Sequence, residues 1–169
     1  PKPSSAASDV YKRQFISGGA INIYQGIASN TFISGGGVIS IRDGIAKNTI
    51  ISQWGNAAVF GSGSALGGIL SDSFMNVNDG YVSGFTITDS AHLTLASGAD
   101  NRADNIIVTS DSVAYFGSDS VVSGLNVSAG AIISAFTSNV YNAHVDDGGV
   151  YTAIQTVTSN LVMSGGSIK

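Results

Sequence analysis

The chain repeats itself about every 18 to 19 residues, and this period restricts the fold more than any other feature of the sequence. Two neighbouring copies, GIASNTFISGGGVISI (26–41) and GIAKNTIISQWGNAAV (44–59), share the pattern G-I-A-x-N-T-(F/I)-I-S. An Asn or Gly at one place in each copy can be followed along the sequence, at spacings of 17 to 21 residues that average about 18.6. Both residue types tolerate a left-handed backbone, so we expect a tight corner at each position. The eight expected corners are Asn30, Asn48, Gly67, Gly84, Asn105, Gly124, Asn142 and Asn160.

The residues after each corner alternate in polarity. Counted from the corner, position +4 is always small and polar, whereas position +3 is always aliphatic or Met. A period of two with one constant apolar position predicts a half-buried strand, and a second short strand is expected later in each unit, as at 39–41 and 93–95. The +3 residues are Ile33, Ile51, Leu70, Ile87, Val108, Val127, Val145 and Met163. At position −3 a further apolar residue recurs in five units, as Ile27, Ile45, Tyr81, Val121 and Val157.

A unit of this length cannot bury its own apolar side, so neighbouring units must stack. Equivalent positions would then pair as parallel strands, one rung about every 4.8 Å. The sequence therefore predicts an all-β fold, a single-stranded parallel β-helix (β-solenoid) with about 8–9 coils of 17–21 residues. A β-sandwich is the alternative, and it explains the strand spacing but not the recurrence of one residue type in every second strand.

The first fourteen residues, PKPSSAASDVYKRQ, do not follow the repeat. The stretch SSAASDVYKRQ resembles a translated sequencing adapter, which is a scar found at the ends of reading frames assembled from metagenomes. We therefore divide the chain into a non-native tail, 1–14, and a β-solenoid repeat domain, 15–169, which we expect to be a fragment of a longer protein.

The repeated segments resemble the AIDA-type repeats of autotransporter adhesin passengers, which are about nineteen residues long and rich in S-G-G, N-T and G-x-A. The match is good over 15–52 and returns in NLVMSGG (160–166), whereas the units between follow the period alone. The resemblance implies a β-helical passenger of a secreted bacterial surface protein, exported through a C-terminal outer-membrane barrel. It also implies partners on host or sister cells, and O-glycosylation of exposed Ser and Thr by a heptosyltransferase in some members.

The composition limits the kinds of catalytic and metal-binding sites that the chain can form. The sequence has no Cys and no Glu, so thiol nucleophiles, disulfides and Cys-based zinc sites are excluded, and only His92 and His144 offer imidazoles. The formal net charge of −4 argues against a nucleic-acid partner. We expect no cofactor, no metal site and no catalytic residues.

One charged segment stands out as a weak candidate for a binding loop. Asp100, Arg102 and Asp104 lie together in the longest unit, where a solvated bulge with a local ion pair is the simpler interpretation. We expect a non-catalytic structural and adhesive rod on the bacterial cell surface, binding cells or glycans. The alternatives are a polysaccharide-acting β-helix lyase or hydrolase and, outside both classes, a phage fibre. Unpaired strands at the two ends of such a rod also lead us to expect end-to-end self-association.

Overall fold

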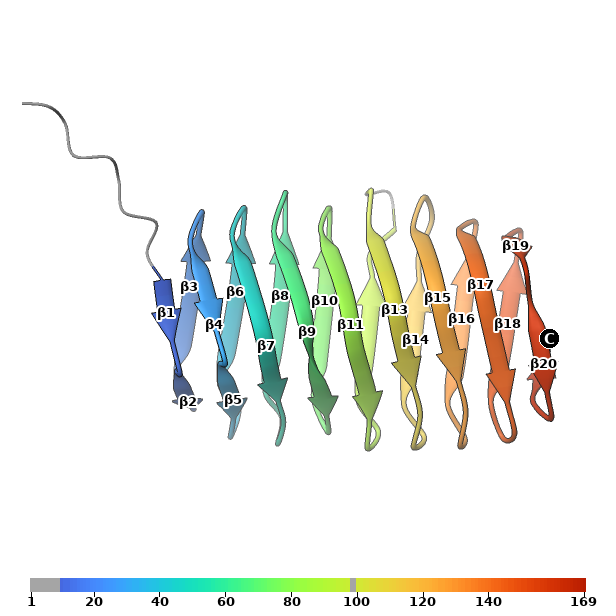
Figure 1. Ribbon diagram of the computed structural model, residues 1–169, viewed down its shortest axis with the longest axis horizontal. Coiled ribbons are helices and arrows are strands. Elements are labelled where there is room, and N and C mark those ends of the chain that lie inside the picture. The colour runs from blue at the N-terminus through green and yellow to red at the C-terminus, as the bar shows by residue number, and fades with distance from the viewer. Residues whose placement is uncertain (1–9, 98–99) are drawn as a thin grey trace, which may run out of the picture.

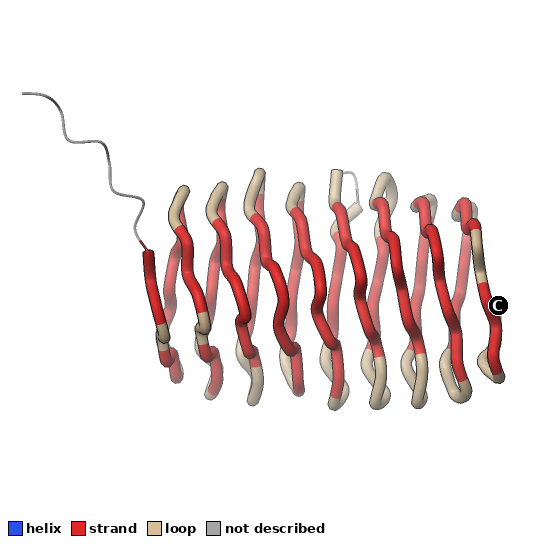
Figure 2. The backbone as a smooth tube through the Cα atoms, viewed as in Figure 1, coloured by secondary structure: helices blue, strands red, loops and turns tan. Residues whose placement is uncertain are grey.

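The computed structural model describes residues 10–97 and 100–169, and they form a flattened rod of stacked coils (Figure 1). Within these residues the chain consists of strands joined by short turns and loops (Figure 2). Each coil contributes to two parallel sheets, here called the front and back sheets as Figure 1 shows them, and the back sheet has nine strands. The predicted β-solenoid is confirmed. No helix in the described part of the chain is long and apolar enough to cross a membrane.

The front sheet contains the long strands, each pairing in parallel with its equivalent in the next coil. In the first, second and last coils this strand is divided into two shorter ones. In spatial order the front strands are β1 (Val10–Lys12) with β2 (Phe15–Ser17), β4 (Ile27–Ser29) with β5 (Phe32–Ser34), β7 (Ile45–Ile51), β9 (Ser64–Ser71), β11 (Tyr81–Thr88), β13 (Arg102–Val108), β15 (Val121–Val127), β17 (Asn139–Asp146), and β19 (Val157–Ser159) with β20 (Val162–Ser164).

The back sheet carries one shorter strand per coil, and every neighbouring pair is again parallel. These strands are β3 (Ala20–Tyr24), β6 (Val38–Arg42), β8 (Asn56–Phe60), β10 (Phe74–Asn78), β12 (His92–Leu95), β14 (Val113–Phe116), β16 (Ile132–Phe136), β18 (Val150–Ile154) and β21 (Ser167–Ile168). The register joins equal repeat positions, so Ile87 pairs with Leu70 on one side and Val108 on the other.

The core consists of columns of apolar side chains between the two sheets. The +3 residues from Ile33 to Val145 are 0–1% exposed, which agrees with the predicted register. Met163 belongs to the same column but is 38% exposed, because it lies in the last coil and no described rung covers it. The back sheet supplies a facing column of Ile39, Ala57, Met75, Leu93, Ala114, Ile133 and Tyr151.

The eight expected corner residues, which we call the bend column, all have positive φ angles between 52° and 69°. Six of them lie inside a front strand, so the backbone bends within the sheet at these residues instead of turning from one sheet to the other. In β7 the bend leaves Lys47 and Asn48 both exposed, while Ala46 and Thr49 on either side are buried. The bend thus shifts the inside–outside alternation by one residue.

This shift determines which residues before the bend face the core. The apolar residues that recur at −3 in five units lie on the outer face of the front sheet, where they are half-buried or exposed. Position −2 faces inward instead, as Ala28, Ala46, Ala65, Val82, Ala103, Val122 and Val140.

The first coil begins upstream of the repeat domain that the sequence delimits. Val10–Lys12 form β1 and pair with Ile27–Ser29 of β4. Arg13 occupies the bend position with a φ of 52°, and the carbonyl of Gln14 accepts a hydrogen bond of 2.7 Å from the amide of Phe32. Residues 10–14 thus complete the first coil, and residues 1–9 of the expected tail lie outside the described residues.

The +3 column provides a direct test of the core. Val108→Asp places a charge at a fully buried position between Ile87 and Val127, where nothing compensates it. We expect a loss of about 3–5 kcal/mol in the free energy of unfolding, enough to weaken or abolish the cooperative transition. The matched control is Ile107→Asp, one residue earlier on the same strand and 42% exposed, which should cost about 1 kcal/mol or less. Thermal unfolding followed by circular dichroism compares the two, and equal effects would contradict the assigned register.

A second test uses pH. Burial raises the pKa of Tyr151, and its hydrogen bond of 2.7 Å to Thr158 Oγ1 opposes this only in part. In the unfolded chain a tyrosine ionises near pH 10, so the contribution of Tyr151 to stability is intact below pH 10 and is lost as the pH rises further. The melting temperature should therefore fall above pH 10, and it should fall less in Tyr151→Phe. An identical alkaline decline in both proteins would contradict this assignment.

Candidate functional site

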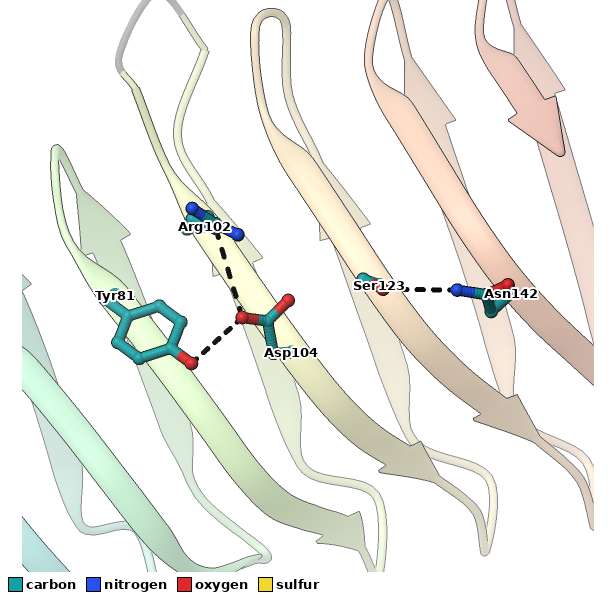
Figure 3. Close-up of polar contacts among 5 residues, drawn as sticks. All are labelled: Tyr81, Arg102, Asp104, Ser123 and Asn142. Atoms are coloured by element: carbon teal, nitrogen blue, oxygen red, sulfur yellow. Dashed lines mark hydrogen bonds and ion pairs between the residues drawn. The ribbon is translucent and has the colours of Figure 1, made fainter.

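The charged segment singled out by the sequence lies at the start of β13. Arg102 Nε is 3.9 Å from Asp104 Oδ2, and the same oxygen accepts a hydrogen bond of 2.9 Å from the hydroxyl of Tyr81 in the preceding coil (Figure 3). The Arg102 side chain is 63% exposed, and such a surface ion pair contributes at most about 1 kcal/mol. Asp104 is therefore occupied by two neighbours within its own sheet.

Asp100 and Arg102 also border a shallow hollow of about 270 Å³ beside the turns that precede β9 and β11. Ser62, Asp79 and Tyr81 complete its polar lining, and the remaining lining residues are glycines that contribute backbone only. Asp104 does not line this hollow. Arg102 takes part in both the ion pair and the hollow, whereas Asp104 belongs only to the ion pair and Asp100 only to the hollow. The arrangement offers hydrogen-bonding groups of both charges to a polar ligand.

His144 lies on β17, where its Nε2 contacts Asp146 Oδ1 at 3.0 Å and Ser164 Oγ at 3.1 Å. A histidine, an aspartate and a serine are thus within contact distance on the front sheet. However, both contacts reach the same ring nitrogen, whereas a catalytic triad uses one nitrogen for the carboxylate and the other for the hydroxyl. The His144 and Asp146 side chains are 41% and 47% exposed, so this arrangement resembles a solvated surface cluster.

The bend column forms a discontinuous ladder of amide side chains on the front sheet. Asn48 Nδ2 donates to Asn30 Oδ1 at 3.5 Å, and Asn160 Nδ2 donates to Asn142 Oδ1 at 3.0 Å. Asn142 Nδ2 in turn donates to Ser123 Oγ at 3.5 Å (Figure 3). The side-chain amides of Asn48, Asn142 and Asn160 thus hydrogen-bond to side chains in the neighbouring coil.

An apolar groove lies beside the first part of this ladder, and the sequence analysis did not predict it. The groove has a volume of about 620 Å³ and runs between the bend column and position +2. Its apolar wall includes Phe15 and Phe32, whose rings stack with centroids 5.5 Å apart, and it continues through Ile50 to Ile69. Three apolar residues at +2 in consecutive units, Phe32, Ile50 and Ile69, were the available signal. Polar residues at +2 in three later units, Thr86, Asn126 and His144, made this signal hard to recognise.

The described surface therefore offers polar ladders, an apolar groove and a small polar hollow. Across residues 10–97 and 100–169 no three side chains of His, Cys, Asp or Glu are gathered so that they could hold a metal ion.

The fold is similar to that of solved structures, and one of them is a fragment of TibA. The match to the crystal structure of a TibC-catalysed hyper-glycosylated TibA fragment covers 95% of this chain and 94% of the TibA fragment. The sequence identity is 15% and the TM-score is 0.36. No protein-family model matches the chain. No curated protein matches it either.

The left-handed conformation of the bend column can be tested at Asn105, whose φ is 55°. Asn105→Gly should leave the stability almost unchanged, whereas Asn105→Val should lower it by about 1–2 kcal/mol because a β-branched residue is strained in this conformation. The control is Asn126→Val, since Asn126 is also exposed on the front sheet but is not among the residues with positive φ. Urea unfolding measures all three, and equal costs for the two valine variants would contradict a special role of the bend.

Proposed function

We propose that this chain is a structural and adhesive repeat region of a secreted bacterial surface protein of the autotransporter type, and that it is not an enzyme. The observation that carries the proposal is the stacking of equivalent outward residues in columns along the rod. In the +4 column, Ser52 and Ser71 are followed by Thr88, Thr109 and Ser128, all at the carboxyl ends of the front strands and all half-buried. Repeated identical contacts give avidity without a single high-affinity site.

The geometry of the polar clusters favours a non-catalytic surface over a catalytic site. Catalysis requires a few groups that are held in one geometry and shielded from water. Arg102 and the His144–Asp146 pair are largely exposed, and Asp104 already accepts a hydrogen bond from Tyr81. These contacts stabilise the front sheet locally without forming an enclosed site.

The proposed partners follow from the same surface together with the resemblance to AIDA-type repeats. Host cells or sister bacterial cells would present glycans to the polar ladders, and exposed Ser and Thr would be substrates for a heptosyltransferase. The location is the extracellular face of the bacterial cell. The division into a non-native tail, 1–14, and a repeat domain, 15–169, stays a prediction.

The proposal predicts adhesion without turnover. Beads coated with the folded chain should be retained on host or sister cells about tenfold or more above beads coated with the unfolded Val108→Asp variant, since avidity requires the columns to be assembled. The same protein, incubated with a panel of plant and bacterial polysaccharides, should release no reducing ends and no unsaturated sugars. Retention is measured by fluorescence, and sugar release by a reducing-end assay and ultraviolet absorbance.

The bead-retention assay and the sugar-release assay test two different parts of the proposal. Equal retention of both bead types would reject adhesion by the folded rod. Sugar release that disappears in Asp79→Asn or Asp100→Asn would reject the non-catalytic assignment and favour a polysaccharide-cleaving β-helix, with the small polar hollow as its site.

A further inference from the structure

The apolar groove on the front sheet lies between two outward columns of side chains. Its lining residues belong to the bend position and to position +2, whereas Thr31 and Thr49 at position +1 are buried, so the backbone at +1 forms the floor. One flank consists of Arg13 and the first three residues of the bend column, and the other consists of the +2 residues from Phe15 to Ile69. The groove thus crosses four neighbouring coils, which gives it a length of roughly 14 Å.

The floor of the groove is closed toward the core. In the fourth coil Gly67 and Gly68 carry no side chains, and a Cβ atom added to Gly68 would lie 2.7 Å from the ring of Phe85 in the next coil. The Phe85 ring is 1% exposed and belongs to the core below. In that next coil Thr86 follows Ile69 at position +2 and ends the apolar flank. A ligand would therefore lie on the sheet surface, along the rod, without entering the core.

Cationic side chains gather beside this groove although the chain as a whole is acidic, with a formal net charge of −4. The front strands of the first four coils, with the bend residues between them, hold three of the seven basic residues and none of the acidic ones. Arg13 lines the groove, and the exposed Lys47 directly precedes the lining residue Asn48. The ion pairs of the described residues lie in later coils, so neither cation is paired with an acid within this part of the chain.

We propose that this groove binds a single-chain anionic amphiphile of the fatty-acid class. The alkyl chain would lie along the apolar +2 flank, and the carboxylate would face the flank beside Arg13 and Lys47. The volume of about 620 Å³ is within the range of small-molecule sites, which combine a mostly apolar wall with a few polar groups. Arg13 lies in the segment expected to be non-native, but Lys47 lies in the repeat domain and supplies a cation independently of that segment.

Two other occupants fit this groove less well. A sugar ring would need an open aromatic face, but Phe15 and Phe32 stack on each other with 20° between their planes, so the faces that they share are covered. A second copy of the chain, docked groove to groove, would bring the cations of both copies together. The inference does not depend on the adhesive role proposed above.

The length and charge of the ligand are tested on the full chain by isothermal titration calorimetry. The probes are octanoate, decanoate, dodecanoate and tetradecanoate, each kept below the concentration at which it forms micelles. Full burial of a methylene tightens binding about fourfold, so a groove open on one side should give about twofold to threefold per methylene until the chain outgrows the groove. Dodecyltrimethylammonium, which carries the opposite charge, should bind about fivefold or more weakly than dodecanoate.

Substitutions at position +2 locate the site. Ile69→Asn removes an apolar side chain from the groove, and its matched control is Ile107→Asn, at the same repeat position and equally exposed (41% and 42%) but outside the groove. Both variants should fold, since Asn126 already occupies position +2 in the coil after Ile107. The affinity for dodecanoate should fall about fivefold to tenfold in Ile69→Asn and stay within about twofold in Ile107→Asn.

Removal of the cations tests the recognition of the carboxylate. A chain with both Arg13→Gln and Lys47→Gln should bind dodecanoate about threefold to fivefold more weakly and bind the uncharged dodecyl maltoside unchanged. The control Arg42→Gln removes an exposed cation from the back sheet and should change neither affinity. Thermal melting followed by circular dichroism establishes that each variant is folded.

Four results would overturn the proposal. They are the absence of dodecanoate binding, equal binding of the cationic amphiphile, equal losses in Ile69→Asn and Ile107→Asn, and an unchanged affinity for dodecanoate in the chain that lacks both cations. Binding to phosphatidylglycerol vesicles without binding of free dodecanoate is a case of the first result, and it would identify contact with a membrane surface instead.

Discussion

The hydrogen bonds between equivalent positions in successive coils are the interaction on which the rest of this structure depends. Parallel pairing fixes the register of each front strand against its predecessor, and this register places inward residues above one another. The longest unit shows how strictly the pairing is kept. The spacing from Gly84 to Asn105 is 21 residues, yet Tyr81 still pairs with Arg102 and Ile87 with Val108. The extra residues are placed in the loop between β12 and β13, where they disturb no pair.

Much of this fold could be predicted from the sequence, because two columns are chemically uniform. Only Asn and Gly occur at the eight expected corners, since they tolerate a positive φ better than most residues, and Arg13 takes this position only in the first coil. At +3 only aliphatic residues or Met occur. The residues before the bend were harder to interpret. The left-handed residue shifts the alternation, so a strict count of two from the corner assigns the wrong face. Position −2 is also Ala in four of the eight units, which gives a weak apolar signal, while larger residues such as Ile45 and Tyr81 occupy position −3.

The candidate site was predicted less well, because its contacts join residues from different coils. Asp100, Arg102 and Asp104 are close in sequence, but the hydroxyl that binds Asp104 belongs to Tyr81, 23 residues earlier. Likewise, His144 meets Ser164 only because consecutive front strands lie side by side. The apolar groove is a third case, since Phe15 and Phe32 stack only once the register is known. Sequence proximity identifies loops, whereas the surface of a solenoid is organised across the strands.

This organisation also limits what such a surface can do. A column repeats one side-chain environment at every rung, so the loss of a single residue removes one contact among several similar ones. A catalytic centre has the opposite property, because removing one member of an acting set abolishes most of its effect. The rung-to-rung pairing therefore favours recognition by many weak, equivalent contacts.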